Sequence, residues 1–288
     1  MVTKEDIHLN EKHNGKRNVS LRRQYNQILS AGGKPLKYTI YIPSKGRPNC
    51  STPKLLGNTK YYLVVEPQDK KAYIDNFGKN KVLVLNKNNK GLWYARKWIK
   101  KYSTKKSEKF HWQIDDDIRA FMKRDVKLQK NKRRTAYSVL GHIENYVQRY
   151  KNIGMAGLKS EAFAWGAKRD LDFNKQIAGV ALLNNKVKVS YRDNVIEDTD
   201  YSMQVLSAGG DYCTVLFNRL ILSTVKLGSN EGGHQSSNDY LKRAKGLIKK
   251  WPQHFKIKER SSDGVKRIAP SSVWRHFTQR PIKKTRKN

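Results

Sequence analysis

The chain has 288 residues, and its 60 Lys and Arg against 24 Asp and Glu give a formal net charge of +36 at pH 7. Hydrophobic residues make up 37% and aromatic residues 10%, which excludes a disordered chain and predicts a sizeable core. The sequence contains no apolar run near the roughly 20 residues that span a bilayer, no apolar secretory signal, and no zinc-binding cluster. We therefore expect a cytoplasmic protein with no membrane partner.

The positive charge indicates a polyanionic partner, and nucleic acid is the leading one. A solvated cationic surface without any partner would have the same composition. An anionic membrane fits less well, because no segment has the one-sided apolar face of a helix that lies on a membrane.

Three regions are expected along the chain. Residues 1–35 form a polar N-terminal extension that ends in the helix-breaking sequence Ala31-Gly32-Gly33-Lys34-Pro35. Residues 36–258 form a single catalytic domain, and residues 259–288 form a basic C-terminal tail.

The first half of the domain predicts alternating strands and helices. Strands are expected at Tyr38–Ile42, Tyr61–Val65, Val82–Leu85 and Phe110–Ile114, and helices at Lys70–Asn76 and Leu92–Tyr102. This alternation predicts an α/β fold with a mainly parallel sheet and helices on both faces. The loops at the carboxyl ends of its strands are then the expected ligand site.

The second half has a less regular pattern and predicts a mixed continuation of the same sheet. Strands are expected at Ile153–Ala156, Ile177–Leu183, Val187–Tyr191 and Tyr212–Phe217, and helices at Tyr137–Tyr150, Thr199–Ser207 and Asp239–Lys250.

Three adjacent carboxylates, Asp115, Asp116 and Asp117, directly follow the fourth predicted strand. Adjacent carboxylates repel one another, so they need either neighbouring cations or a divalent metal with hard oxygen ligands. Mg²⁺ or Mn²⁺ held there would keep positions open for diphosphate oxygens, as in the Asp-x-Asp arrangement of sugar-nucleotide enzymes. A solvated acidic loop is the alternative interpretation.

Two further segments suit a polyanion. The exit of the first strand, Pro43-Ser44-Lys45-Gly46-Arg47, carries a hydroxyl and two cations that suit a nucleotide, although it also fits an ordinary strand exit. Downstream of the aspartates, a basic stretch contains one acid, Asp125, and could position a phosphate backbone or be a solvated loop. Its cations are Lys123, Arg124, Lys127, Lys130, Lys132, Arg133 and Arg134.

The order of four motifs resembles a known family. Ile42-Pro43-Ser44-Lys45-Gly46-Arg47-Pro48, Leu63-Val64-Val65-Glu66-Pro67-Gln68, Asn89-Lys90-Gly91 leading to Ala95-Arg96, and Gln113-Ile114-Asp115-Asp116-Asp117-Ile118 are similar to GT-A-fold glycosyltransferases. Among these, they most resemble the phage enzymes called TET-associated glycosyltransferases. The resemblance covers roughly residues 38–239 and implies a GT-A-like, Rossmann-type fold.

The resemblance also implies roles for these motifs. Asp115 and Asp117 would bind the Mn²⁺ or Mg²⁺ ion, and Asp116 would lie near the ribose or sugar of the UDP-sugar donor. Pro43, Ser44, Lys45, Arg47, Glu66, Lys90 and Gly91 would hold the nucleotide, and Arg96 would face the donor. The sequence departs from a frequent family pattern at Lys97, where Asn usually follows the arginine.

Two later motifs would complete the site. Glu197-Asp198-Thr199-Asp200 resembles the Glu-Asp motif of inverting GT-A enzymes, which makes Asp198 the expected general base with Glu197 and Asp200 beside it. The same carboxylates would also favour a helix N-terminus by charge and capping. His234 would be the third metal ligand, although a lone His is more often structural or solvated.

The implied reaction is sugar transfer to a hydroxylated pyrimidine, such as 5-hydroxymethylcytosine, in the DNA of a phage inside its bacterial host. A base that is flipped out of a duplex could stack on Trp93, Phe163 or Trp165, although core packing would explain each of these equally well. A metal-dependent nuclease or nucleotidyltransferase would also combine aspartates with a basic surface. A non-catalytic DNA-binding protein would leave the ordered donor motifs unexplained.

Overall fold

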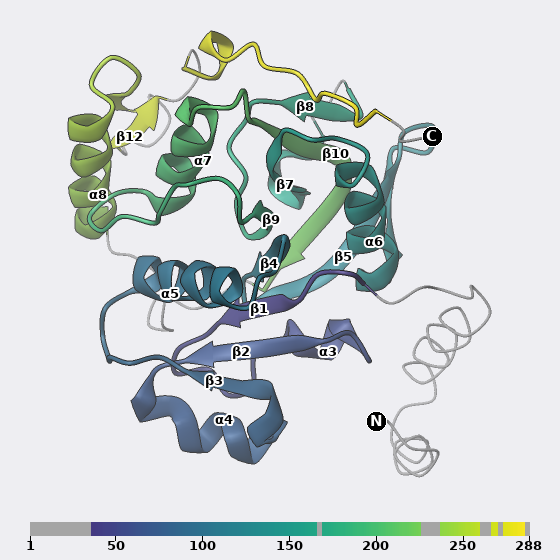
Figure 1. Ribbon diagram of the computed structural model, residues 1–288, viewed down its shortest axis with the longest axis vertical. Helices are drawn as coiled ribbons and strands as arrows, with labels where there is room; N and C mark the ends of the chain where they lie inside the picture. Colours follow the sequence, from purple (N-terminus) through teal and green to yellow (C-terminus); the bar gives the residue numbers. More distant parts are fainter. Residues whose placement is uncertain (1–35, 166–168, 226–236, 260–265, 270–272, 286–288) are drawn as a thin grey trace.

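The computed structural model describes residues 36–165, 169–225, 237–259, 266–269 and 273–285. Its centre is a ten-stranded sheet with the strand order β3-β2-β1-β4-β9-β7-β10-β5-β6, and β8 also pairs with β10 (Figure 1). The strands are β1 (Ile40–Pro43), β2 (Tyr61–Val65), β3 (Val82–Val84), β4 (Phe110–Ile114), β5 (Ile118–Asp125), β6 (Lys130–Arg134), β7 (Ile153–Ser160), β8 (Leu171–Phe173), β9 (Val180–Asn184) and β10 (Cys213–Thr224). A separate two-stranded sheet consists of β11 (Lys256–Glu259) and β12 (Lys266–Ala269).

Helices flank the sheet and connect its strands (Figure 1). The α-helices are α3 (Pro53–Leu56), α4 (Lys70–Phe77), α5 (Leu92–Lys105), α6 (Ala136–Val147), α7 (Glu197–Ser207) and α8 (Ser237–Lys250). The 3₁₀ helices are η1 (Pro67–Asp69), η2 (Lys79–Lys81), η3 (Glu161–Phe163) and η4 (Val273–His276). None of the helices in the described ranges is long and apolar enough to cross a bilayer.

The predicted parallel part of the sheet is confirmed. β1 pairs in parallel with β2 and β4, and β2 pairs in parallel with β3. β2 and β4 have the predicted bounds, whereas the first strand begins two residues later, at Ile40. Because these strands are parallel, the loops that follow β1, β2, β3 and β4 meet at one edge of the sheet.

The second half of the sheet is mixed, as predicted. β9 is antiparallel to both β4 and β7, and β10 is parallel to β7. The predicted strand at Val187–Tyr191 is wrong, because this segment is irregular. Val187 and Tyr191 are buried against α7, so the apolar residues reflect burial of a connecting segment and not its secondary structure.

The basic stretch after the aspartates forms a β-hairpin that the sequence interpretation did not assign. β5 pairs with β10 and β6 pairs with β5, both antiparallel. Ala120 and Met122 are buried on one face of β5, whereas Phe121, between them, is buried in the large core cluster on the other face. β6 is the last strand in the sheet order and is rich in lysine and arginine, a composition that discourages strand addition at an exposed edge.

The two faces of the sheet carry different helices. Ile40 and Ile42 pack into the large cluster that includes α6, whereas Tyr41, between them, packs in the cluster of α5. α7 packs on β7 and β10, where its Tyr201 and Val205 bury the neighbouring Met155 and Leu216. The alternation along each strand therefore separates two cores, as expected for a sheet covered on both faces.

The described part of the C-terminal region packs on the domain. Val273 and Trp274 of η4 join a hydrophobic cluster with residues of α7 and α8. Further along, the backbone N–H of Lys151 donates to the carbonyl of Ile282 at 2.9 Å. The predicted extension at residues 1–35 lies outside the described residues.

Gly246 allows α8 to approach the loop before α7. A Cβ atom at this position would lie 1.8 Å from the carbonyl oxygen of Asn194. Alanine normally stabilises an exposed helix relative to glycine by about 1 kcal/mol, but here we expect Gly246→Ala to destabilise the protein by about 1–3 kcal/mol through overpacking. Urea unfolding measures this change, with the exposed Lys245→Ala on the same helix as control; an equal or higher stability of Gly246→Ala would contradict the packing.

Candidate active site

The aspartate loop lies at the carboxyl edge of the parallel strands, between β4 and β5, and its backbone is held from several sides. The N–H of Asp115 donates to the carbonyl of Gly179 at 2.8 Å, and the N–H of Val225 donates to the carbonyl of Asp117 at 2.8 Å. Thr52 supports the same loop, because its hydroxyl donates to the carbonyl of Asp115 at 2.6 Å. The three carboxylates therefore occupy a fixed turn and not a mobile acidic loop.

Asp116 is neutralised by the exit of β1. Its side chain is 2% exposed, accepts a hydrogen bond from the hydroxyl of Ser44, and forms an ion pair with Arg47 at 2.5 Å. Tyr73 of α4 supports this arrangement, with its hydroxyl 2.6 Å from the Ser44 hydroxyl and 3.0 Å from the backbone N of Arg47. Asp116 thus orders the Ser44–Arg47 loop and leaves Asp115 and Asp117 as the open pair.

Arg96 connects the aspartate loop to the start of α7. Its guanidinium lies 2.7 Å from Asp115 Oδ1 and 3.7 Å from Asp198 Oδ1, and its side chain is almost fully buried in the first turns of α5. Although burial disfavours its charged form, the charges of Asp198 and Asp115 raise the pKa of Arg96 above its ordinary value. The guanidinium therefore remains charged and holds together two carboxylates from distant segments.

Asp117 has an unpartnered oxygen that suits a cation. Its Oδ1 is buried without a hydrogen-bond partner, and burial together with the charge of Asp116 raises the pKa of the side chain. Desolvation also raises the pKa of Asp115 to about 6, although Arg96 lowers it. Two carboxylates with hard oxygen atoms, held in a desolvated place where one oxygen has no hydrogen-bond partner, fit a divalent cation.

Within the described ranges, no three His, Cys, Asp or Glu side chains are grouped to hold a metal. The predicted third ligand, His234, lies outside the described residues. Asp115 and Asp117 would therefore leave most coordination positions of Mg²⁺ or Mn²⁺ to other ligands, such as the diphosphate oxygens of a nucleotide.

The predicted nucleotide loops are joined by Glu66, at the end of β2. This nearly buried carboxylate lies 3.3 Å from the ammonium of Lys45 and accepts hydrogen bonds from the Asn89 backbone at 2.9 Å and the Gln68 side chain at 2.9 Å. The exits of β1, β2 and β3 thus form one connected rim. Lys90 and Gly91 are exposed on this rim, where Gly91 directly precedes α5 with a φ of 82° that favours glycine.

Arg47 has spare hydrogen-bonding capacity at the rim. Its Nη2 pairs with Asp116, but its Nε and Nη1 are buried without a partner. Buried donors normally find an acceptor, so unsatisfied guanidinium N–H groups beside a cationic lysine mark a place for an anion. Pro43, buried at the end of β1, positions this loop without contributing a polar group.

The carboxylates at the start of α7 have different environments. Glu197 is largely buried and lies 2.9 Å from Arg243 of α8, whereas the side chain of Asp198 is 19% exposed beside Arg96. Asp200 is fully buried and accepts hydrogen bonds from Arg192, from Gln204 at 2.7 Å, and from Trp251 at 2.8 Å. The residue before the helix, Ile196, makes no side-chain cap. Asp198 is therefore the carboxylate of this group that solvent or a substrate can reach.

Burial also gives Asp198 a proton affinity suited to a base near neutral pH. Desolvation raises its pKa to about 7; Arg96 opposes this rise, and the negative charges of Glu197 and Asp115 add to it. A carboxylate with a pKa near the working pH can accept and return a proton efficiently.

The predicted DNA-binding cations lie on the β5–β6 hairpin, which begins one residue beyond Asp117. All of them are exposed except Arg124, whose guanidinium donates to Gln129 and, at 3.3 Å, to Asn131. Among these cations, Lys132 has a described carboxylate partner, Asp125, at 2.8 Å. The hairpin therefore extends a largely uncompensated positive surface away from the aspartates.

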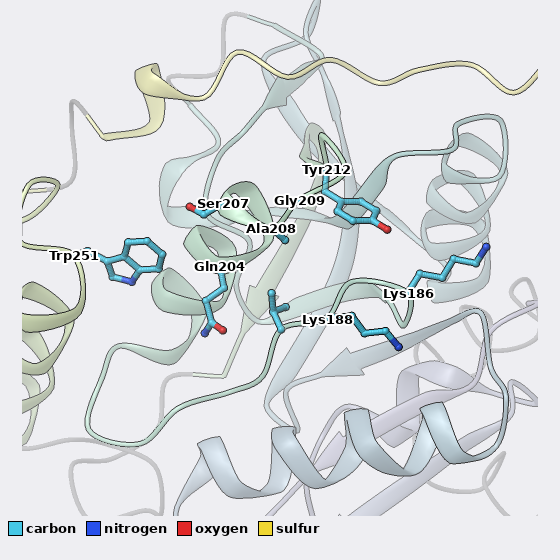
Figure 2. Close-up of a pocket in the computed structure, with 9 residues that line it drawn as sticks. Lys186, Lys188, Gln204, Ser207, Ala208, Gly209, Tyr212 and Trp251 are labelled. Atoms are coloured by element: carbon cyan, nitrogen blue, oxygen red, sulfur yellow. The ribbon is translucent and has the colours of Figure 1, made fainter.

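A groove of about 380 Å³ lies at the opposite end of α7 from Asp198 (Figure 2). Lys186 and Lys188 line it together with Gln204, Ser207, Tyr212 and Trp251. Lys186 lies two residues after Asn184, which pairs with Phe110 at the beginning of β4, so the groove is near the sheet edge opposite Asp115. These lysines thus provide cationic surface remote from the candidate site.

Sequence reasoning missed Thr52, Tyr73 and Gly179 as supports of the site. Thr52 directly precedes the short helix α3 and Tyr73 lies in α4, where the apolar neighbours indicate only packing. Gly179 has a φ of 72°, and a Cβ there would lie 3.6 Å from Asp115 Oδ2. The sequence contains no motif for these residues, because their roles depend on contacts between segments far apart in the chain.

Comparison with known proteins identifies the family. Residues 38–233, more than half of the chain, match the model of the TET-Associated Glycosyltransferase family. A search of curated proteins finds no match. Among solved structures, the chain is similar to a proposed nucleotide-diphospho-sugar transferase from Desulfovibrio desulfuricans G20, with 9% identity, a TM-score of 0.38, and coverage of 74% of this chain and 97% of the other.

The family match covers the motifs on which the resemblance was based and the whole ten-stranded sheet that carries the candidate site. The mixed α/β sheet, its helices on both faces and the loops at its parallel edge agree with the predicted GT-A-like fold class. The chain therefore belongs to the TET-associated glycosyltransferase family.

Proposed function

We propose that this glycosyltransferase uses a divalent metal to transfer a sugar from a UDP-sugar to the hydroxyl of a modified base, of the 5-hydroxymethylcytosine type, in phage DNA. The observation that carries the proposal is the position of Arg96, which places Asp198 beside an aspartate loop with an unpartnered oxygen on Asp117. One site thus combines a cation-seeking group, anion-seeking donors and a base.

Each group has a distinct task in the proposed reaction. Asp115 and Asp117 would hold Mn²⁺ or Mg²⁺, which supplies positive charge to the leaving diphosphate. The free donors of Arg47, with Lys45 at the same rim, would bind donor phosphates. Asp198 would accept the proton of the acceptor hydroxyl while Arg96 holds its carboxylate in place.

Glu197 and Asp200 are left with positioning roles in this proposal. Glu197 ties α7 to Arg243 of α8, and Asp200 anchors the preceding loop through Arg192. The excess positive charge is assigned to the acceptor, since the hairpin that carries the exposed cations begins next to the metal loop, and these cations can neutralise DNA phosphates.

The metal role predicts a coupled loss of cation binding and transfer. In Asp115→Asn and Asp117→Asn, we expect Mn²⁺ to lose its effect on the melting temperature and sugar transfer to fall by roughly 100-fold or more, because a ligand carboxylate is removed. Thermal shift and mass analysis of digested 5-hydroxymethylcytosine DNA measure these effects. Asp75→Asn, at an exposed ion pair on α4, is the control. Full sugar transfer by both Asp115→Asn and Asp117→Asn would refute the metal role. Cleavage of the DNA by the unaltered protein would favour a nuclease.

The base role predicts a pH dependence. Because Asp198 must be deprotonated and its pKa is raised to about 7, kcat/KM should rise about tenfold per pH unit below 7 and become constant above it. Asp198→Asn should abolish this profile together with most of the activity.

The raised pKa of Asp198 also affects stability. Asp198 favours folding at acid pH, and this contribution is lost as pH rises through about 7. The free energy of unfolding of Asp198→Asn should therefore depend less on pH between about 4 and 7 than that of the unaltered protein. If Asp198→Asn keeps the pH profile of kcat/KM, Asp198 is not the base.

The hairpin role predicts a specific salt effect. We expect Lys130→Ala with Arg133→Ala to weaken duplex DNA binding and to reduce the slope of log affinity against log salt by about 2, because two phosphate contacts are lost. Fluorescence anisotropy across a salt series measures both quantities. Lys186→Ala with Lys188→Ala, in the groove of Figure 2, removes the same charge at a remote place. Equal losses in the two double variants would mean that DNA responds only to net charge.

A further inference from the structure

Two aromatic side chains project from the loop after β7. Phe163 is 72% exposed and Trp165 is 65% exposed, the highest values among large hydrophobic side chains in the described part of the chain. Trp93, by contrast, is half-buried and packs against the cluster beneath α7. Core packing therefore explains Trp93 but neither Phe163 nor Trp165, and such exposed neighbours commonly mark a binding surface.

The residue between them fixes the loop. Ala164 is completely buried and packs with Ala120 and Met122 of β5 and Ile221 of β10. Its backbone N–H donates to the carbonyl of Glu161 at 3.2 Å and closes the turn of η3. The two aromatic side chains thus extend from an anchored backbone, which reduces the entropy lost when a ligand packs on them.

The loop is connected to the basic hairpin through Arg124. The guanidinium of Arg124 lies 4.4 Å from the centroid of the Trp165 ring, within the range of a cation–π interaction. Arg124 is itself 5% exposed and is held by Gln129 and Asn131. Trp165 therefore has a defined support on the hairpin while most of its surface remains open.

The same loop lies at the edge of the sheet that carries the candidate active site. Ser160, at the end of β7, is in register with Leu222 of β10. Gly179 separates Leu222 from the aspartates, since a Cβ there would be 3.6 Å from both Leu222 and Asp115. The loop therefore begins at the sheet edge that carries the aspartates, and its Ala164 packs on β5 at Ala120 and Met122, between Ile118 and Arg124 in the chain.

Exposed rings beside exposed cations fit a nucleic acid strand better than a neutral ligand. Bases stack on aromatic rings irrespective of sequence, while lysine and arginine follow the phosphates. A paired base within a duplex offers no free ring face, so the occupant must be unpaired or flipped. A carbohydrate could also pack on the rings, but it would leave the adjacent hairpin cations unused.

We propose that Phe163 and Trp165 form a stacking platform for an unpaired nucleobase of the acceptor strand, supported by Arg124 and flanked by the β5–β6 hairpin. This inference rests on the proposed DNA acceptor and identifies residues that hold a base of the acceptor strand beside the basic hairpin. The platform recognises the ring face of a base and not its hydrogen-bonding edge, so it accepts any base sequence next to the reactive one.

The test measures binding of a single-stranded oligonucleotide that contains 2-aminopurine, without donor or metal, by fluorescence quenching and anisotropy. We expect Trp165→Ala and Phe163→Ala each to raise Kd by roughly 5- to 100-fold, and Trp165→Phe to restore most of the affinity. Quenching of 2-aminopurine should decrease in the alanine variants, a signal of lost stacking that a change in net charge does not produce. The exposure of both side chains predicts unchanged melting temperatures.

Controls separate this inference from the proposed function. Lys186→Ala with Lys188→Ala should leave quenching unchanged, and UDP should stabilise the platform variants as it stabilises the unaltered protein. Unchanged binding and quenching in Phe163→Ala and Trp165→Ala would overturn the platform even if the protein glycosylates DNA. Reduced sugar transfer with unchanged oligonucleotide binding would assign the rings to a carbohydrate and also overturn it. Oligonucleotide stacking without transfer to any modified DNA would retain the platform and reject the proposed acceptor reaction.

Discussion

The site depends on a single buried cation, the guanidinium of Arg96. It lies between Asp115, which follows β4, and Asp198, which begins α7, although these residues are far apart in the chain. Without this positive charge, Asp115 and Asp198 would lose the cation that they share in a largely desolvated region, which is energetically costly. Arg96 therefore couples the positions of α5, the aspartate loop and α7.

The protein separates its charges by environment. Most acidic groups of the site are buried and each has a specific cation, as in the pairs of Asp116 with Arg47 and Glu197 with Arg243. The hairpin has the opposite arrangement, with exposed lysine and arginine and little compensation among the described residues. Buried charges require partners because desolvation is costly, whereas exposed charges are hydrated and remain available to a polyanion. The net charge of +36 consequently describes the surface and not the site.

Much of the fold could be predicted because its parallel half is local in sequence. β2 and β4 follow from short apolar runs, and their alternation with α4 and α5 indicates the order of the units. The error at Val187–Tyr191 and the missed β5 have a common cause. Strand formation there depends on a distant partner, since β5 requires β10, whereas the apolar segment after β9 has none and packs irregularly under α7.

The sequence by itself determined which residue types were available: an aspartate triplet after an apolar strand, a hydroxyl and cations after the first strand, and a Glu-Asp pair before a helix. Their local periodicity also determined most elements that carry them. Only the tertiary structure decided their separate environments. Asp116 is paired with Ser44 and Arg47, and Asp200 is buried and accepts hydrogen bonds from several side chains. Asp117 keeps one oxygen without a hydrogen-bond partner. The physical reason is that burial and pairing depend on segments brought together by the sheet, and a residue's chemistry follows from those contacts.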